Sequence, residues 1–142
     1  MTTPSFAPTI RTQSELRDAW QHLMGPWDYS GPSVWLMLIH DDRPLPHLTE
    51  IAEADEPDPE MLVGLSELLR MLEHQVVPGG RVAFLRSRPG PDVVTPADRQ
   101  WASGLYAAAR GADVACEVIH LATRGSIRPI PPDDVAFVAT NA

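Results

Sequence analysis

Lysine is absent from this sequence, and all eleven of its basic residues are arginines. Nineteen acidic residues bring the net charge to −8 at pH 7. A general nucleic-acid-binding protein needs a field opposite in sign to that of phosphate, so this balance argues against that class. Arginine is well suited to bidentate anion contacts, but the absence of lysine also fits a GC-rich genome and by itself indicates no function.

Cysteine and long apolar runs are also scarce. The single cysteine, Cys116, cannot form an internal disulfide, and its apolar surroundings in the sequence favour a small buried side chain over a catalytic one. No apolar run approaches the roughly 20 residues of a membrane span, and the first residues, MTTPSFAPTI, lack the features of a signal peptide. We therefore expect a cytoplasmic protein without a membrane segment.

Common catalytic and nucleotide-binding motifs are missing as well. There is no glycine-rich phosphate-binding motif, and no two histidines have the i,i+3 or i,i+4 spacing of a helical metal site. His40 and His47 flank a predicted turn, with Asp41, Asp42 and Glu50 nearby in the sequence. Surface polar residues are the favoured interpretation of this group, and a metal site is the alternative. We expect no cofactor.

What is present indicates an ordinary globular domain. A chain of 142 residues with 44% hydrophobic and 21% charged residues is long enough for one domain with a genuine core. Residues 1–11 have no apolar periodicity and contain two prolines, so we expect a flexible N-terminal tail there. Residues 12–142 are then the single domain.

Three helices are predicted from capping residues and apolar spacing. Thr12 begins a Thr-x-x-Glu capping box. Asp58 and Thr95 are good N-caps, and each is followed by a proline at the first helical position. Gly111 is a natural helix terminator. The predicted helices run from Thr12 to the break at Gly25-Pro26, from Asp58 to about Gln75, and from Thr95 to the terminator Gly111.

Four strands are predicted between and after these helices, at residues 33–40, 47–54, 81–86 and 114–121. The first, SVWLMLIH, is apolar throughout, as expected for a strand covered on both faces. The proline-rich end leaves two options: Asp133 or Asp134 caps a last helical turn, or residues 135–139 add an edge strand. Strands that alternate with helices predict a single layered α/β domain in which about three helices pack on a mixed sheet.

Two arginines stand where the third predicted strand meets a loop rich in proline and glycine. Arg86 ends the strand and Arg88 lies at the start of the loop, and Thr95 and Asp98 open the helix that follows it. Strand ends beside loops are common places for a site in an α/β domain. However, the loop from 87 to 94 contains no His, Cys or Glu, so no catalytic residue is identified there.

Residues 33–135 resemble a RadC-like JAB/MPN domain, which has a deaminase-like layout, in the order of their predicted elements. In that family the third strand ends in His-x-His-Pro, and a Ser-x-x-Asp motif opens the next helix. The family's two histidines and aspartate hold zinc, and an upstream glutamate activates the zinc-bound water. Here the corresponding positions are Arg86-Ser87-Arg88 and Thr95-Pro96-Ala97-Asp98, and Glu50, or less well Glu53, stands where the glutamate is expected.

The loss of the histidines excludes zinc chemistry if this correspondence holds. A guanidinium has no free lone pair and stays charged, so two arginines beside Asp98 would repel a dication. Two interpretations remain open. The arginines pair with Asp98 as a structural charge cluster, or they bind a small anion such as phosphate or a nucleotide near the start of the helix at Thr95.

The resemblance implies that the domain is a non-catalytic protein-interaction or dimerisation module. A homodimer through the strand at 47–54 or the neighbouring helices is one form of this hypothesis, because exposed edge strands invite pairing. The acidic stretch EADEPDPE, residues 53–60, is interpreted as a solvated loop, with a docking surface for a basic partner as the alternative. The other functional hypotheses are the anion-binding site and an enzyme of unrecognised chemistry.

Overall fold

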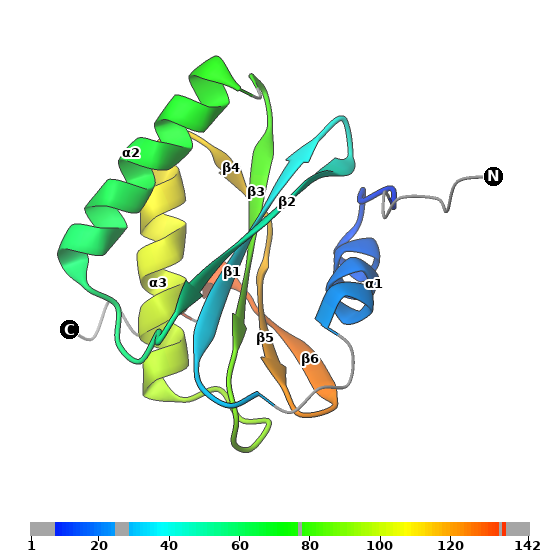
Figure 1. Ribbon diagram of the computed structural model, residues 1–142, viewed down its shortest axis with the longest axis vertical. Coiled ribbons are helices and arrows are strands. Elements are labelled where there is room, and N and C mark those ends of the chain that lie inside the picture. Colours follow the sequence, from blue (N-terminus) through cyan, green and yellow to red (C-terminus); the bar gives the residue numbers. More distant parts are fainter. Residues whose placement is uncertain (1–7, 25–28, 77, 134, 136–142) are drawn as a thin grey trace.

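The computed structural model describes residues 8–24, 29–76, 78–133 and 135 (Figure 1). The helices of this part of the chain are α1 (Gln13–Met24), α2 (Pro59–Gln75) and α3 (Pro96–Gly111). Its strands are β1 (Ser33–His40), β2 (Arg43–Ala52), β3 (Arg81–Ser87), β4 (Ala115–Cys116), β5 (Ile119–Thr123) and β6 (Ser126–Ile130). The expectation of one α/β domain with three helices on a mixed sheet is confirmed.

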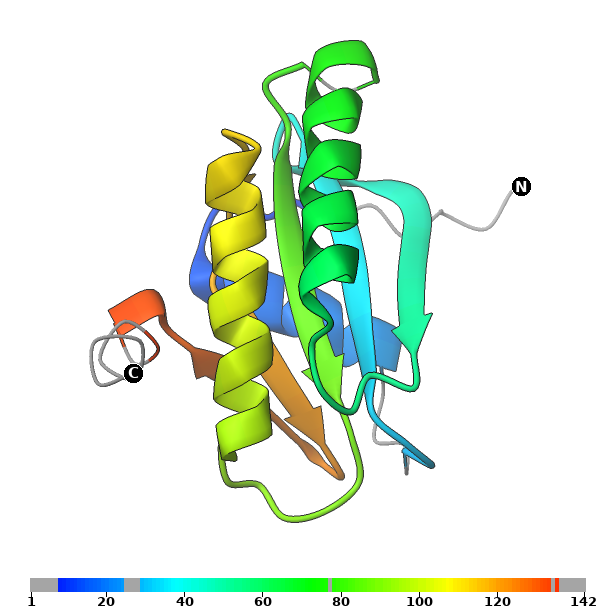
Figure 2. The same cartoon turned by 90° about the vertical axis from the view of Figure 1, so that its left-hand side faces the viewer.

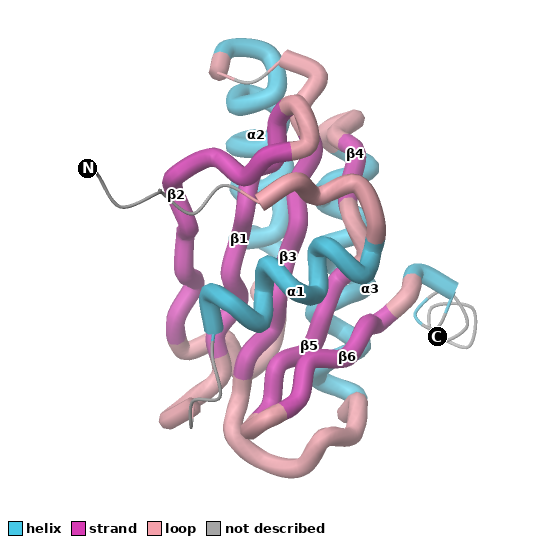
Figure 3. Tube along the Cα trace, turned by 90° about the vertical axis from the view of Figure 1, so that its right-hand side faces the viewer, coloured by secondary structure: helices cyan, strands magenta, loops and turns pink. Residues whose placement is uncertain are grey.

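The strands form one sheet in the order β2-β1-β3-β5-β6, and the short β4 pairs with β3 before β5 does. β3 is antiparallel to β1 and parallel to β4 and β5, while β5 and β6 form an antiparallel hairpin. α2 and α3 lie side by side on one face of the sheet (Figure 2), and α1 crosses the other face (Figure 3). β2 and β6 are therefore the edge strands of the sheet that the described residues form.

Apolar cores fill both sides of the sheet. Under α2 and α3, side chains such as Phe84 and Leu121 pack against Trp101 and Leu105. Under α1, Leu85 and Ala122 pack against Trp20. Successive residues of β3 and β5 therefore point alternately into the core under α2 and α3 and into the core under α1, because side chains alternate along a strand.

The starts of α2 and α3 are those predicted. Asp58 accepts a hydrogen bond from the backbone N–H of Glu60 at 3.0 Å, as an N-cap does. Thr95 Oγ1 accepts from the Asp98 N–H at 3.2 Å, and Asp98 Oδ2 accepts from the Thr95 N–H at 2.8 Å. This reciprocal capping box places Asp98 at the buried end of α3.

The turn between β1 and β2 is shorter than predicted. The sequence suggested a turn through DDRPLP and a strand from His47, but β2 begins at Arg43 and the turn consists of Asp41 and Asp42. Both aspartates have positive φ, at 53° and 62°, which is the conformation of a tight two-residue hairpin turn. The prolines at 44 and 46 fit within β2 because it is an edge strand.

The C-terminal strands also differ from the prediction. The single strand expected at 114–121 is split into β4 and β5, because this chain carries one more residue between its pairings with Arg81 and Leu85 than β3 does. β6, which contains Pro129, was not predicted and forms the second edge. Asp133 and Val135 are helical, while Asp134 and residues 136–139 of the proposed last strand lie outside the described residues.

The flexible N-terminal tail was predicted to extend to residue 11, but the domain begins before that residue. Ile10 is buried in the core under α1, and its N–H donates to the Asp42 carbonyl at 2.6 Å. The Arg81 guanidinium donates to the Ile10 carbonyl and pairs with Asp42 at 3.0 Å. Ile10 therefore belongs to the domain, and residues 1–7 lie outside the described chain.

Candidate functional site

Arg86, Arg88 and Asp98 converge at the edge of the core between β3 and α3. Arg86 Nε donates to Asp98 Oδ1 at 2.7 Å, and Arg88 Nη2 donates to Asp98 Oδ2 at 2.8 Å. Their residue exposures are 3% for Arg86, 7% for Arg88 and 0% for Asp98. The contact predicted from the strand end and the helix start is confirmed. We call these three residues the arginine–aspartate cluster.

Arg88 is the centre of the loop that follows β3. Its Nε–H is shared between the two Asp98 oxygens, at 2.9 and 3.1 Å. Its Nη1 donates to the carbonyls of Pro89 and Pro91, and Nη2 donates to the carbonyl of Val93 at 2.6 Å and to Asp98. All five N–H groups of this guanidinium are thereby used within the protein. The loop from 89 to 93 is wrapped around the side chain.

Arg86 is held by a different set of groups. Its Nη1 donates to the Ala54 carbonyl at 2.6 Å, and its guanidinium carbon lies 6.0 Å from the centre of the Trp101 ring. Arg86 thus links the segment before α2 to the first turns of α3, in addition to its bond with Asp98. A cation over an indole ring is a favourable arrangement.

The charge of the cluster is not balanced by its own side chains. Two guanidinium groups and one carboxylate leave a net positive charge. The backbone carbonyls that accept hydrogen bonds from Arg86 and Arg88 face this charge. Burial alone would raise the pKa of Asp98, but hydrogen bonds from Arg88, the Thr95 backbone and Arg86 outweigh it and lower this pKa to about 2. The carboxylate is also at the N-terminal end of α3, where the helix dipole favours negative charge. Asp98 is therefore ionised throughout the neutral range.

The loop is fixed on its outer side as well. Asp92 accepts hydrogen bonds from Ser126 Oγ at 2.9 Å and pairs with Arg128 Nε at 2.8 Å. These contacts tie the loop to the β5–β6 hairpin. This second attachment could not be predicted from the sequence, because its partners are more than thirty residues away from Asp92.

Gly90 permits the loop to turn closely around Arg88. Its φ is 103°, and a Cβ at this position would lie 3.2 Å from Arg88 Nη1. We expect Gly90→Ala to lower the free energy of unfolding by about 1 to 3 kcal/mol, since it adds backbone strain and crowds the guanidinium. Urea denaturation measures this loss.

Gly125→Ala is the matched control for this substitution. Gly125 also has positive φ, at 73°, but a Cβ there meets no atom within 4 Å. The control isolates the backbone cost, which we expect to be about 1 kcal/mol. Equal losses in the two variants would contradict the close packing of the loop on Arg88.

Glu50 does not belong to the cluster. Glu50 pairs with Trp35 across β1 and β2, whereas Arg86 pairs with Val34, the preceding residue of β1. Consecutive strand residues point to opposite faces of a sheet, so Glu50 lies on the α1 side and Arg86 on the α2–α3 side. Glu50 Oε2 accepts instead from Ser33 Oγ at 2.8 Å. Glu53, the less favoured position, is exposed in the turn after β2 with a φ of 55°.

The other metal candidates lie outside any such cluster. His40 Nδ1 is 3.6 Å from Asp41, and the side chain of His47 is outside the described part of the structure. Among the described residues, no three His, Cys, Asp or Glu side chains gather in a way that could hold a metal ion.

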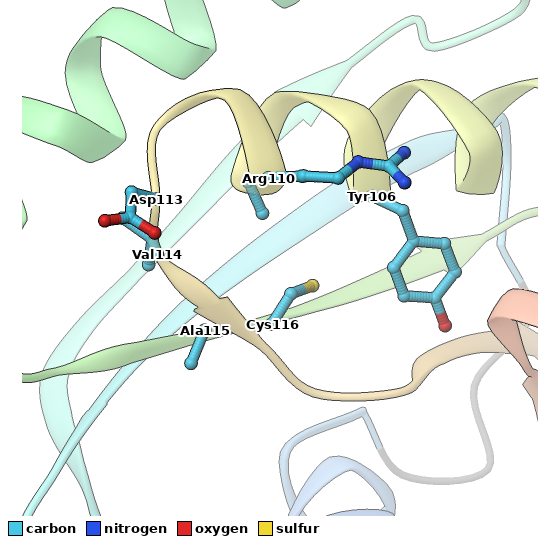
Figure 4. A pocket seen from close by; sticks show the side chains of 7 residues that line it. Tyr106, Arg110, Asp113, Val114, Ala115 and Cys116 are labelled. Carbon is cyan, nitrogen blue, oxygen red and sulfur yellow. The ribbon is translucent and has the colours of Figure 1, made fainter.

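A shallow depression of about 530 Å³ opens beside Cys116 at the C-terminal end of α3 (Figure 4). Tyr106, Arg110 and Asp113 line it together with the cysteine. Burial, helped by the nearby Glu117 carboxylate, raises the pKa of the Cys116 thiol to about 12. Since the thiolate is the reactive form, this shift lowers the reactivity of the thiol at neutral pH. Cys116 lies in a strand, β4, as expected, but it is only partly buried and packs against the core under α2 and α3.

Comparisons with known proteins add no assignment to this geometry. None of the described helices is both long and apolar enough to cross a membrane. No protein-family model, curated protein or solved structure matches the chain.

Proposed function

We propose that this chain is a non-catalytic, JAB/MPN-like protein-interaction domain that contacts its partner through the exposed side of α2. The observation that carries the proposal is a row of apolar residues on α2 that faces away from the core. Leu68 and Met71 are 41% and 45% exposed, and Gly64 precedes them on the same side of the helix.

The arrangement of α2 makes this row distinct from the core-facing residues. Leu65 and Leu69 are buried against the sheet, and Ser66 Oγ donates to the Ala108 carbonyl of α3 at 2.8 Å. Residues 64, 68 and 71 are spaced by four and three, so they occupy one strip of the helix away from α3. Four of the six large apolar side chains that are exposed in the described chain lie on α2 or at its C-cap: Val63, Leu68, Met71 and Val76.

The burial and the internal hydrogen bonds of the arginine–aspartate cluster support the non-catalytic part of the proposal. Asp98 is fully buried, and every N–H group of Arg88 is already donated. The same geometry gives less support to the alternative, an anion site at Arg86, Arg88 and the start of α3. A phosphate could reach these donors only if the loop released Arg88.

Support for the JAB/MPN relationship comes from the order of the elements. A hairpin, a helix, a strand with the site loop, a capped helix and a parallel strand follow one another as that resemblance implies. In this proposal the two guanidinium groups keep positive charge beside Asp98, where relatives hold a metal ion. Glu50 does not fit the correspondence, because it faces the other side of the sheet.

The test is site-specific photo-crosslinking in the cells from which the sequence comes. A photoreactive residue in place of Leu68 or Met71 is expected to give one discrete crosslinked adduct, either with another protein or with a second copy. The same residue in place of Val93, which is 59% exposed on the loop after β3, is the control and should give none. Absence of an adduct at 68 and 71, or equal adducts at 93, would overturn the proposal.

A further inference from the structure

The exposed side of α2 is acidic as well as apolar. Glu60, Gly64, Glu67, Leu68 and Met71 are spaced by three, four and seven residues, so they share one side of the helix, and all five are exposed. We call them the α2 face. It combines two carboxylates with two large apolar side chains. The exposed basic residues of α2, Arg70 and His74, flank it beside Glu67, and Arg70 is directed to the Gly111 carbonyl of α3 at 2.7 Å.

The segment that leads into α2 extends this charge. Between β2 and the first turn of α2, the acidic side chains are exposed and none forms a salt bridge with a described residue: Glu53, Asp55, Glu56, Asp58 and Glu60. Ala54, between them, is buried, and its carbonyl accepts a hydrogen bond from Arg86 Nη1. The arginine–aspartate cluster therefore holds in place the acidic segment that precedes the α2 face.

Gly64 provides a gap between the apolar and acidic side chains. A Cβ at Gly64 would meet no atom within 4 Å, so the space above this residue is open. Leu68 lies one turn further along the same side of α2. A side chain from a partner can enter above Gly64 and contact Leu68 without displacing any group of this protein.

Charge complementarity decides which occupant fits this surface. A second copy would bring the same carboxylates against the α2 face, and like charges across an interface are unfavourable. Phosphate-rich partners, which include nucleic acids and anionic membranes, are repelled for the same reason. A helix with basic residues flanking an apolar stripe matches both features, because such a helix places cations near Glu60 and Glu67 and apolar side chains on Leu68 and Met71.

We propose that the α2 face binds a basic amphipathic helix of another protein. This inference rests on the proposed function and specifies its partner. The apolar stripe of the partner packs along Gly64, Leu68 and Met71. Its basic residues pair with Glu60 and Glu67 and with the acidic segment before α2. Binding therefore weakens as the salt concentration rises, because exposed ion pairs are screened.

The test uses two fluorescently labelled synthetic peptides of equal length, an amphipathic helix of leucine and lysine and its counterpart of leucine and glutamate. Fluorescence anisotropy with the full chain should give saturable binding of the lysine peptide only. The combined substitution of Leu68→Ala and Met71→Ala should weaken this binding about 10-fold or more, as expected for central interface residues. Val93→Ala, on the loop after β3, should leave the Kd unchanged.

A second pair of variants tests how much the carboxylates contribute to peptide binding. Glu67→Gln should raise the Kd several-fold, whereas Asp18→Asn, which removes an exposed carboxylate from α1 on the other face of the sheet, should not. Lysine-peptide binding that is unaffected by the substitutions at 67, 68 and 71 would overturn the inference, and so would the absence of binding.

Sedimentation velocity separates this inference from the proposed function. We expect a monomer for the wild-type chain. A dimer that Leu68→Glu dissociates would overturn the basic-helix partner and leave the proposed interaction role of α2 in place. Failure of both the peptide and the crosslinking experiments would remove the proposed function as well.

Discussion

Asp98→Ala is expected to lower the free energy of unfolding by about 3 to 5 kcal/mol, since it leaves two buried guanidinium groups without their carboxylate. Asp98 accepts from Arg86 and Arg88 and is 0% exposed. The substitution also removes half of the capping box with Thr95. Chemical denaturation followed by far-ultraviolet circular dichroism measures the loss.

Asp58→Ala separates the charge cluster from ordinary helix capping. Asp58 is the N-cap of α2, whereas Asp98 is the third residue of α3 and completes a capping box with Thr95. Asp58 caps its helix but is exposed and has no arginine partner among the described residues. Its removal should cost about 1 kcal/mol, the usual value for an N-cap. If the two variants lost the same stability, the cluster would contribute nothing beyond the cap. Should Asp98→Ala fail to fold, Asp98→Asn, which keeps the shape and removes the charge, gives the same comparison.

The features that could be predicted from the sequence are those fixed by neighbouring residues. The helix starts at Asp58 and Thr95 were predicted correctly because N-caps and a following proline act within one turn. β1 was predicted with its exact bounds because its apolar run is continuous. The pairing of Arg86 and Arg88 with Asp98 followed from the short path between a strand end and the next helix.

The features that were missed depend on distant partners. Nothing local to Pro129 shows that β6 lies at a sheet edge, where a proline is tolerated. The split between β4 and β5 depends on the register with β3. Glu50 was placed near the cluster because its position in the chain fits the resemblance, but the alternation of side chains along β2 directs it to the opposite face. A one-residue difference in register is enough to make that change.

The sequence also could not show that the N–H donors of Arg88 are already used within the protein. Arginines beside a loop suggest free donors, and only the backbone path around Gly90 brings three loop carbonyls to Arg88. The choice between a structural cluster and an anion site therefore depended on the loop conformation. In the structure, the donors that would bind an anion hold the loop and the start of α3 together instead. This is why the exposed side of α2, rather than the loop from 89 to 93, supports the functional proposal.

Acidification is expected to destabilise the fold well above the pH at which Asp98 titrates. His120 is 0% exposed on the α1 side of β5, beside Leu85 of β3 and Pro129 of β6. Its Nδ1 bonds to the Val118 carbonyl at 3.0 Å, and its Nε2 has no partner in the described structure. Because a carbonyl only accepts, Nδ1 carries the proton and the neutral ring is the form that is buried.

The direction of the pH effect follows from the pKa of this ring. Burial lowers the pKa of His120 from 6.5 to about 4, with a further lowering by the Arg17 charge and a partly opposing effect of the Val118 carbonyl. Between these values the unfolded chain binds a proton that the folded chain does not, so stability rises with pH. The contribution is complete above pH 6.5 and is lost as the pH falls to about 4, and the total is about 3 kcal/mol.

His120→Leu should remove this pH dependence. The variant is expected to lose some stability at pH 7, because the Val118 carbonyl loses its donor, but its free energy of unfolding should change little between pH 6.5 and 4. His74→Gln is the control, since His74 is exposed on α2, and it should keep the wild-type slope. Asp98, with its pKa of about 2, affects stability only below its ordinary value of 3.8, so its contribution lies in a separate window. Urea denaturation at a series of pH values makes the measurement, and a slope that persists in His120→Leu would show that another group binds the proton.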